Sequence, residues 1–220
     1  MQCNVMRIIA PLLFAVFSTP VMACETALVL TIDVSNSIDP AEYKLQTIGL
    51  AEALRAPEIV NALVRQEATL AVVQWSGADR QELSIPWTQV RTSLDAARLA
   101  DQSQQMPRAF VLSDTAPAEA IMFSMNLFSQ VPDYKNKVID VSGDGTPNSG
   151  SETRQARRAA ERAGVTINGI AIESMGLSIT SFFKQAIITR NGFVITARTH
   201  REYPDAIRRK ILRELSQVLG

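Results

Sequence analysis

A short apolar segment at residues 27–32, ALVLTI, runs directly into the polar sequence DVSNS at residues 33–37. The apolar segment is rich in branched residues, which is typical of a strand buried inside a parallel sheet. Asp33, Ser35 and Ser37 then lie at the carboxyl end of that strand, the edge where open α/β sheets bind ligands. A carboxylate and two hydroxyls are hard oxygen ligands of the kind that Mg2+ prefers. A local interpretation stays open, in which the serines cap the next helix and Asp33 accepts hydrogen bonds from loop amides.

The rest of the chain alternates between strand-like and helix-like segments. Pro86 cannot donate to a central ladder, so the strand that contains it is expected to be short and at an edge of the sheet. Strands that alternate with helices in one domain predict a doubly wound, mostly parallel α/β sheet with one antiparallel edge strand and helices on both faces. We expect strands at residues 68–75, 83–87, 137–141, 165–172 and 193–196, and helices at 40–54, 93–102, 117–128, 152–163, 180–188 and 203–219.

The composition favours an ordinary globular domain. The chain is 46% hydrophobic and 20% charged, and its formal net charge of zero gives no support to nucleic-acid binding. His200 is the only histidine, so neither a histidine-based metal cluster nor a Ser-His-Asp triad is predicted. We expect His200 on the surface before the last helix. Arg154, Arg157, Arg158 and Arg162 are expected to form a solvated helix face, with a partner surface as the alternative.

The N-terminal residues 1–23 have the pattern of a secretory signal peptide. Arg7 precedes an apolar run at residues 8–17, and small residues stand before Cys24. The run is too short for a transmembrane helix, and no later segment is long and apolar enough to span a bilayer. Cleavage after Ala23 therefore predicts a periplasmic or secreted protein.

The mature domain is then residues 24–220, from a chain that starts at Met1 or, alternatively, at Met6. Cys24 would be its first residue and its only cysteine, so no disulfide within the chain is expected. A lipid anchor on Cys24 remains the alternative to a soluble exported protein.

Two more polar loops are expected near the same edge of the sheet. The strand at 137–141 runs into SGDGTPN, where small residues allow a tight turn and Asp144 leaves the sheet. The sequence SDTAP at 113–117 precedes a helix, and its local interpretation is a helix cap from Asp114 or Thr115. In the other interpretation, the segment 113–117 is a third loop that supplies a ligand to the site. Three polar loops at one edge favour a shared site more strongly than any one of them.

These loops resemble the metal-ion-dependent adhesion site of von Willebrand factor A domains, which combines a D-x-S-x-S loop, a Thr and an Asp. The segments IDVSGDGTPN and VTINGIAI also resemble a bacterial exported subfamily of unknown function, and the resemblance covers nearly all of the mature chain. It implies that Ser35 and Ser37 bind the metal directly, Thr115 directly or through water, and Asp33 and Asp144 largely through water.

The resemblance also implies a function. The metal would be Mg2+, with Mn2+ or Ca2+ as alternatives, and its neutral direct ligands would leave it able to accept an acidic side chain from a protein partner. We therefore predict an exported, metal-dependent protein-binding module and no enzyme activity.

A haloacid-dehalogenase-like phosphatase is the alternative function. Asp33 would be its nucleophile, GDGTPN at 143–148 resembles its last motif, and Lys135 or Lys137 would bind the phosphate. That chemistry needs a second acid two residues after the nucleophile, where this chain has Ser35. The missing acid disfavours this alternative.

Overall fold

The computed structural model describes residues 26–173 and 178–217. The predicted signal peptide, both candidate start residues and Cys24 lie outside the described residues, so export and lipidation remain predictions. Among the described helices, none has the length and apolar character needed to cross a membrane.

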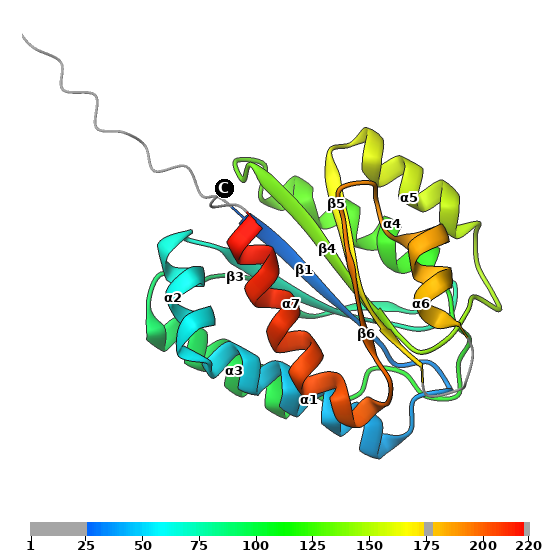
Figure 1. Cartoon of the computed structure of the whole chain (residues 1–220), viewed down its shortest axis with the longest axis horizontal. Helices are drawn as coiled ribbons and strands as arrows, with labels where there is room; N and C mark the ends of the chain where they lie inside the picture. The colour runs from blue at the N-terminus through cyan, green and yellow to red at the C-terminus, as the bar shows by residue number, and fades with distance from the viewer. Residues whose placement is uncertain (1–25, 174–177, 218–220) are drawn as a thin grey trace, which may run out of the picture.

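The six strands form one sheet in the order β3-β2-β1-β4-β5-β6 (Figure 1). Every neighbouring pair is parallel except β2 and β3, which are antiparallel, and β3 lies at one edge. The predicted doubly wound sheet with one antiparallel edge strand is therefore confirmed. The strands are β1 (Thr26–Asp33), β2 (Thr69–Trp75), β3 (Gln81–Gln89), β4 (Asn136–Gly143), β5 (Val165–Ile172) and β6 (Val194–Ala197).

Helices cover both faces of the sheet (Figure 1). One face carries α1 (Pro40–Arg55), α2 (Pro57–Arg65), α3 (Ser93–Gln105) and α7 (Tyr203–Gln217). The other carries α4 (Pro117–Leu127), α5 (Thr153–Arg162) and α6 (Ile179–Phe182), which continues as a π-helical turn, Phe183–Ile187. Short 3-10 turns occupy Phe128–Gln130 and His200–Glu202. Two apolar layers sandwich the sheet, and every residue of β1 between them is buried, as its mainly apolar sequence predicts.

Two elements differ from the sequence-based expectation. Helix α2 was not predicted, although its buried Ile59, Ala62 and Leu63 have helical spacing. Pro57 holds Ala56 in an extended conformation, so α1 and α2 are separated by this one residue. Strand β3 is longer than the predicted segment 83–87, because the β2–β3 register shifts near the exposed Pro86 and the ladder continues beyond it.

A buried ionic cluster ties α7 to the middle of the sheet. The Nζ atom of Lys210 lies 2.6 Å from Oδ1 of Asp140 and 2.5 Å from Oε1 of Glu214. Asn168 donates to Oε1 of Glu214 at 2.8 Å. Burial raises the pKa of Asp140 above its ordinary range, and the Lys210 ammonium opposes that shift.

Candidate metal centre

The first loop, residues 33–37, is held rigidly at the carboxyl end of β1. Asp33 is fully buried, and its Oδ1 accepts the Ser35 N–H at 2.8 Å. The guanidinium of Arg108 donates from Nη2 to the carbonyls of Val34 and Ser35, each at 2.9 Å. The cap of α1 is Asp39, in a capping box with Glu42. The interpretation of Ser35 and Ser37 as helix caps is therefore wrong, although Asp33 does satisfy a loop amide.

The third loop, residues 143–149, meets the first through a chain of hydroxyls. Ser35 Oγ lies 3.1 Å from Ser37 Oγ, which donates to Oδ1 of Asp144 at 2.5 Å. Asp144 is 1% exposed. A Cβ on Gly143 would lie 3.0 Å from Asp33 Oδ2, so the end of β4 comes this close only because position 143 has no side chain.

The second loop, residues 113–116, is bonded to both of the others. The carbonyl of Ser113 accepts the Asn36 N–H of the first loop at 2.9 Å. The N–H of Thr115 donates to Oδ1 of Asn148 at 2.8 Å, and the Asn148 N–H donates back to the Thr115 carbonyl at 3.1 Å. The sequence-predicted site residues Asp33, Ser35, Ser37, Thr115 and Asp144 are thus brought to one edge of the sheet.

Thr115 does not cap the following helix. The N-cap of α4 is Ala116, which makes no side-chain capping bond, so the predicted cap from Asp114 or Thr115 is wrong. Within the described residues, the Thr115 hydroxyl makes no hydrogen bond, and a Cβ on Gly145 would lie 3.8 Å from it. The hydroxyl is therefore available to a ligand beside the third loop.

Each of the two buried carboxylates leaves one oxygen atom without a hydrogen bond. In the described part of the chain, Oδ2 of Asp33 and Oδ2 of Asp144 are both buried and accept no hydrogen bond. Burial raises the pKa of Asp33 to about 7, and hydrogen bonds from Ser35 oppose the shift. Burial also raises the pKa of Asp144, opposed first by the Ser37 hydrogen bond. A bound cation would compensate both oxygens, so these residues fit the metal that the sequence resemblance implies.

This donor set depends on hydroxyls. No group of three or more His, Cys, Asp or Glu side chains in the described ranges is arranged to hold a metal ion. Two carboxylates and the hydroxyls of Ser35, Ser37 and Thr115 are an all-oxygen set, suited to a hard divalent cation.

His200 is buried beside this edge, so its expected place on the surface is wrong. It is 3% exposed, with Nδ1 at 2.8 Å from Oε1 of Glu42 and Nε2 at 3.9 Å from Oδ2 of Asp144. The 3-10 turn that carries it packs against α1. Sequence reasoning also missed Arg108, because its two carbonyl partners lie more than 70 residues away in the chain.

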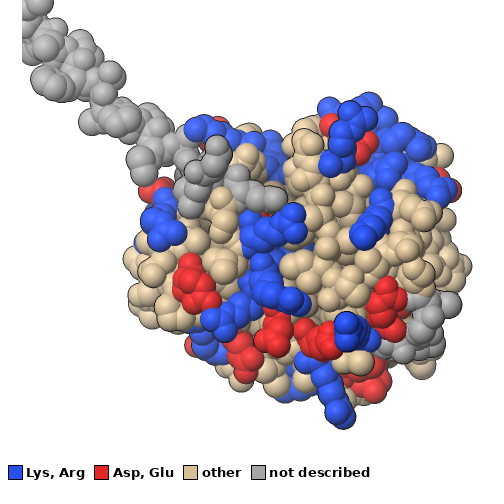
Figure 2. Space-filling model, in the orientation of Figure 1, with Lys and Arg blue, Asp and Glu red and all other residues tan. Residues whose placement is uncertain are grey.

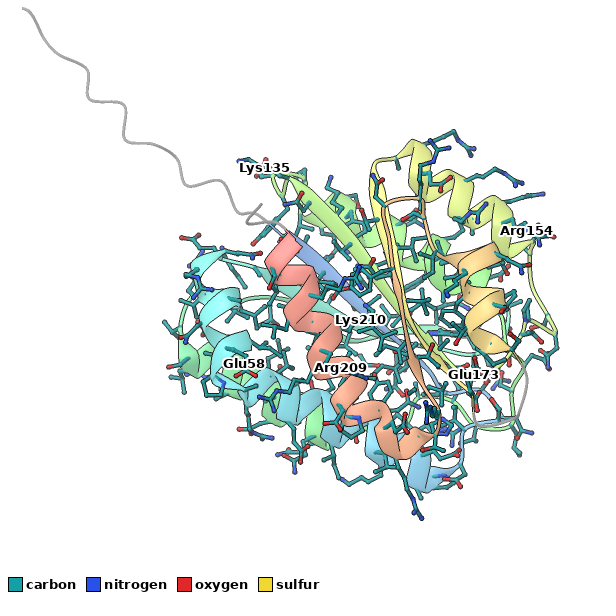
Figure 3. The ribbon with its side chains drawn as sticks, in the orientation of Figure 1. Glu58, Lys135, Arg154, Glu173, Arg209 and Lys210 are labelled. Atoms are coloured by element: carbon teal, nitrogen blue, oxygen red, sulfur yellow. The ribbon has the colours of Figure 1, made fainter. Side chains whose placement is uncertain are left out.

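The lysines required by the phosphatase alternative lie elsewhere. Lys137 is near the start of β4, paired in register with Ala27 at the start of β1. Figure 3 shows Lys135 at the same end of the sheet, opposite to Glu173, which follows the carboxyl end of β5. Asp33 is at the carboxyl end of β1, so neither lysine is placed to bind a phosphate there.

This chain has the fold of von Willebrand factor A domains, which are among the solved structures that it matches. Proximal thread matrix protein 1 from the mussel byssus, with a zinc-occupied MIDAS motif, matches with a TM-score of 0.68 and 20% identity over 87% of this chain. The match covers 48% of the mussel chain, so this chain spans about half its length. The manganese-loaded TRAP protein of Plasmodium vivax matches with a TM-score of 0.57 and 15% identity, over 86% of this chain and 74% of that one.

A third match is the vWF domain of the type V pili tip protein Mfa5 from Porphyromonas gingivalis. It has a TM-score of 0.65 and 10% identity, over 90% of this chain and 97% of that one. The chain belongs to the family described as "Protein of unknown function (DUF1194)", whose model matches residues 23–219. A comparison with curated proteins gives no match.

Proposed function

We propose that this protein is an exported binding module that holds a divalent cation between the three loops and uses it to bind a carboxylate of a protein partner. The observation that carries the proposal is a pair of buried oxygens that accept no hydrogen bond in the described structure, Asp33 Oδ2 and Asp144 Oδ2, beside the linked hydroxyls of Ser35 and Ser37. A buried carboxylate is costly unless its charge is compensated or it takes up a proton, and a bound cation supplies the compensation.

In this proposal the hydroxyls of Ser35, Ser37 and Thr115 are direct or water-mediated ligands, and Asp33 and Asp144 hold waters and orient the hydroxyls. Mg2+ is the proposed ion, with Mn2+ or Ca2+ as alternatives; the zinc and manganese named for two structural neighbours support a divalent cation more generally. When bound, the cation would supply an electrophilic position that an acidic side chain can complete.

The chain's own contacts would keep the three loops in register for that partner. Arg108 fixes the first loop through two carbonyls, and Asn148 links the second loop to the third. No enzyme activity is proposed, because Ser35 stands where a phosphatase needs its general acid. The comparisons with matrix, pilus-tip and TRAP proteins support a binding role.

Export is part of the proposal. The signal-peptide pattern at residues 1–23 supports a periplasmic or secreted mature domain, with attachment to the envelope through a lipid on Cys24 as the alternative. The partner is proposed as a protein and not as a nucleic acid.

The test is calorimetric titration of the mature chain with Mg2+, Mn2+ and Ca2+, together with thermal unfolding in each metal. We expect binding and a metal-dependent rise in melting temperature, since a ligand that binds only the folded state stabilises it. Asp33→Asn and Asp144→Asn should abolish both, whereas Asp133→Asn, an exposed carboxyl outside the three loops, should retain them. The absence of any metal response in the wild-type chain would refute the site.

A further inference from the structure

Helix α5 carries a row of arginines that repel one another. Arg154, Arg158 and Arg162 are spaced by four residues and are all exposed. Like charges at this spacing destabilise a helix. Within the described part of the chain, none of the three forms an ion pair, although exposed arginines on other helices do, as in Arg55–Asp101 and Arg208–Glu58. Figure 2 shows the resulting concentration of basic side chains over α5, at the upper right.

The row leads into a pocket at the C-terminal end of α5. This pocket has a volume of about 520 Å³ and is lined by Arg158, Arg162 and Arg190, together with the polar residues Thr166 and Asn191. It lies where β5 begins, which is the edge of the sheet opposite to the candidate metal centre. The second wall of this pocket is the segment of residues 189–191, which lies between the π-helical turn and β6.

A second pocket of about 580 Å³ adjoins the first and shares Glu161, Thr189 and Arg190 with it. Arg157 and Lys184 line this second pocket. Arg157 is held in place by a 2.8 Å hydrogen bond from its Nη1 to the Gln185 carbonyl. Its buried Nε has no hydrogen-bond partner in the described structure.

The two pockets are strongly positive. Their walls hold five cationic side chains, Arg157, Arg158, Arg162, Lys184 and Arg190, and one carboxylate, Glu161. That carboxylate already accepts the backbone N–H of Arg190 at 3.1 Å. Guanidinium groups present several N–H donors in a plane, a geometry that matches the oxygens of a phosphate group.

We propose that these adjoining pockets bind a phosphate-bearing anion through Arg158, Arg162 and Arg190, independently of the metal centre. An anion there compensates the repulsion along α5 and uses neutral donors that line the same pocket. The volume is within the range of roughly 300–1,000 Å³ found for small-molecule sites. Both a soluble phosphorylated compound and the headgroup of a phospholipid present this chemistry.

The experiment compares the wild-type mature chain with the triple variant Arg158→Gln/Arg162→Gln/Arg190→Gln. The matched control is Arg65→Gln/Arg91→Gln/Arg98→Gln, which removes the same charge from exposed positions near α2 and α3. All samples contain EDTA, so that the metal centre plays no part. The probes are inorganic phosphate and pyrophosphate, measured by calorimetry and thermal unfolding against chloride at equal ionic strength. A second arm measures cosedimentation with phosphatidylglycerol vesicles and with phosphatidylcholine vesicles.

We expect pyrophosphate to bind more tightly than phosphate and to raise the melting temperature of wild type and control. The arginine variant should fold, because the three side chains are exposed and form no ion pair in the described structure, and it should bind at least roughly tenfold more weakly. Cosedimentation with the anionic vesicles alone, lost in the same variant, identifies a lipid headgroup; binding of the soluble probes alone identifies a free phosphorylated compound. No binding in either arm, or equal binding by the arginine variant and the control, overturns the proposal.

Discussion

Ser37 donates a hydrogen bond of 2.5 Å to Asp144, a residue 107 positions later in the chain. This contact joins the loop after β1 to the loop after β4, two strands that are neighbours in the sheet. It places a hydroxyl and a buried carboxylate together, so the same side chains that close the loops also form the proposed donor set.

Ser37→Ala is expected to weaken both the loop contact and metal binding. Removing the hydroxyl deprives a buried carboxylate of a donor, which typically costs about 1–3 kcal/mol of unfolding free energy. Urea denaturation without metal measures that loss, and calorimetry measures the metal affinity, which should fall. Ser93→Ala, an exposed serine at the start of α3, should change neither. An unchanged metal affinity in Ser37→Ala would remove Ser37 from the ligand set.

Thr115→Val is expected to affect metal binding more than folding. The Thr115 hydroxyl makes no hydrogen bond in the described structure and caps no helix, so stability should stay within about 1 kcal/mol. Metal affinity should fall and Thr115→Ser should restore it, as measured by calorimetry and thermal unfolding. A large loss of stability with intact metal binding would show that the side chain has only a structural role.

Arg108→Met is expected to loosen the first loop. The substitution keeps most of the side-chain stem but removes the two donors to the Val34 and Ser35 carbonyls. We expect a loss of about 1–3 kcal/mol in unfolding free energy and weaker metal binding. Arg91→Met serves as the exposed control. If metal affinity is the same in both variants, Arg108 does not position the ligands.

The metal-free protein should lose stability as pH rises toward neutrality. The pKa of Asp33 is raised from 3.8 to about 7, so between these values the folded state holds a proton that the unfolded chain has released. Its stabilising contribution is complete below the unfolded pKa and is lost as pH rises through the folded pKa. Asp140 and Asp144 have raised pKa values as well, so the wild-type slope contains all three groups.

Asp33→Asn isolates the contribution of Asp33. In EDTA, this variant should show a smaller fall in melting temperature between about pH 4 and pH 7 than wild type. The metal-induced rise in the melting temperature of wild type should grow over the same range, because the carboxylates must be deprotonated to bind. Identical pH profiles for the two metal-free proteins would contradict the assignment of the shift to Asp33.

Export predicts a defined N-terminus. Mass spectrometry of the cell envelope and culture medium should find a mature chain that begins at Cys24. An added diacylglycerol mass on Cys24 would identify a lipoprotein, and an unmodified terminus would identify a soluble protein. A mature protein that retains Met1 or Met6 would contradict cleavage in either form.

The fold was largely predictable, because its strands have recognisable local sequence patterns. Residues 27–32 and 165–172 are short, mainly apolar segments rich in branched residues, and each forms a largely buried parallel strand. The strand that contains Pro86 was placed correctly at an edge. The length of this strand was not predicted correctly, because the register shift depends on the partner strand and is not indicated by the local sequence.

The loops that meet at the candidate centre were also identified from the sequence, because strand direction brings their residues to one edge. The contacts that support these loops were not identified from the sequence. Arg108 and His200 act through partners remote in the chain, and nothing in their local sequence indicates burial or a contact. The repulsive row on α5 was visible in the sequence, whereas Arg190, which completes its pocket, comes from another segment.

The length of β5 also determines the distance between the two proposed sites, which lie at opposite ends of the parallel strands. The strand has eight residues, and at about 3.3 Å per residue it separates the opposite edges of the sheet by roughly 26 Å. Ligands at the two edges would therefore not collide, and neither would need to leave before the other arrives. A chain that binds both ligands would act as a connector, with a carboxylate of a protein partner at one end of its strands and a phosphate-bearing anion at the other.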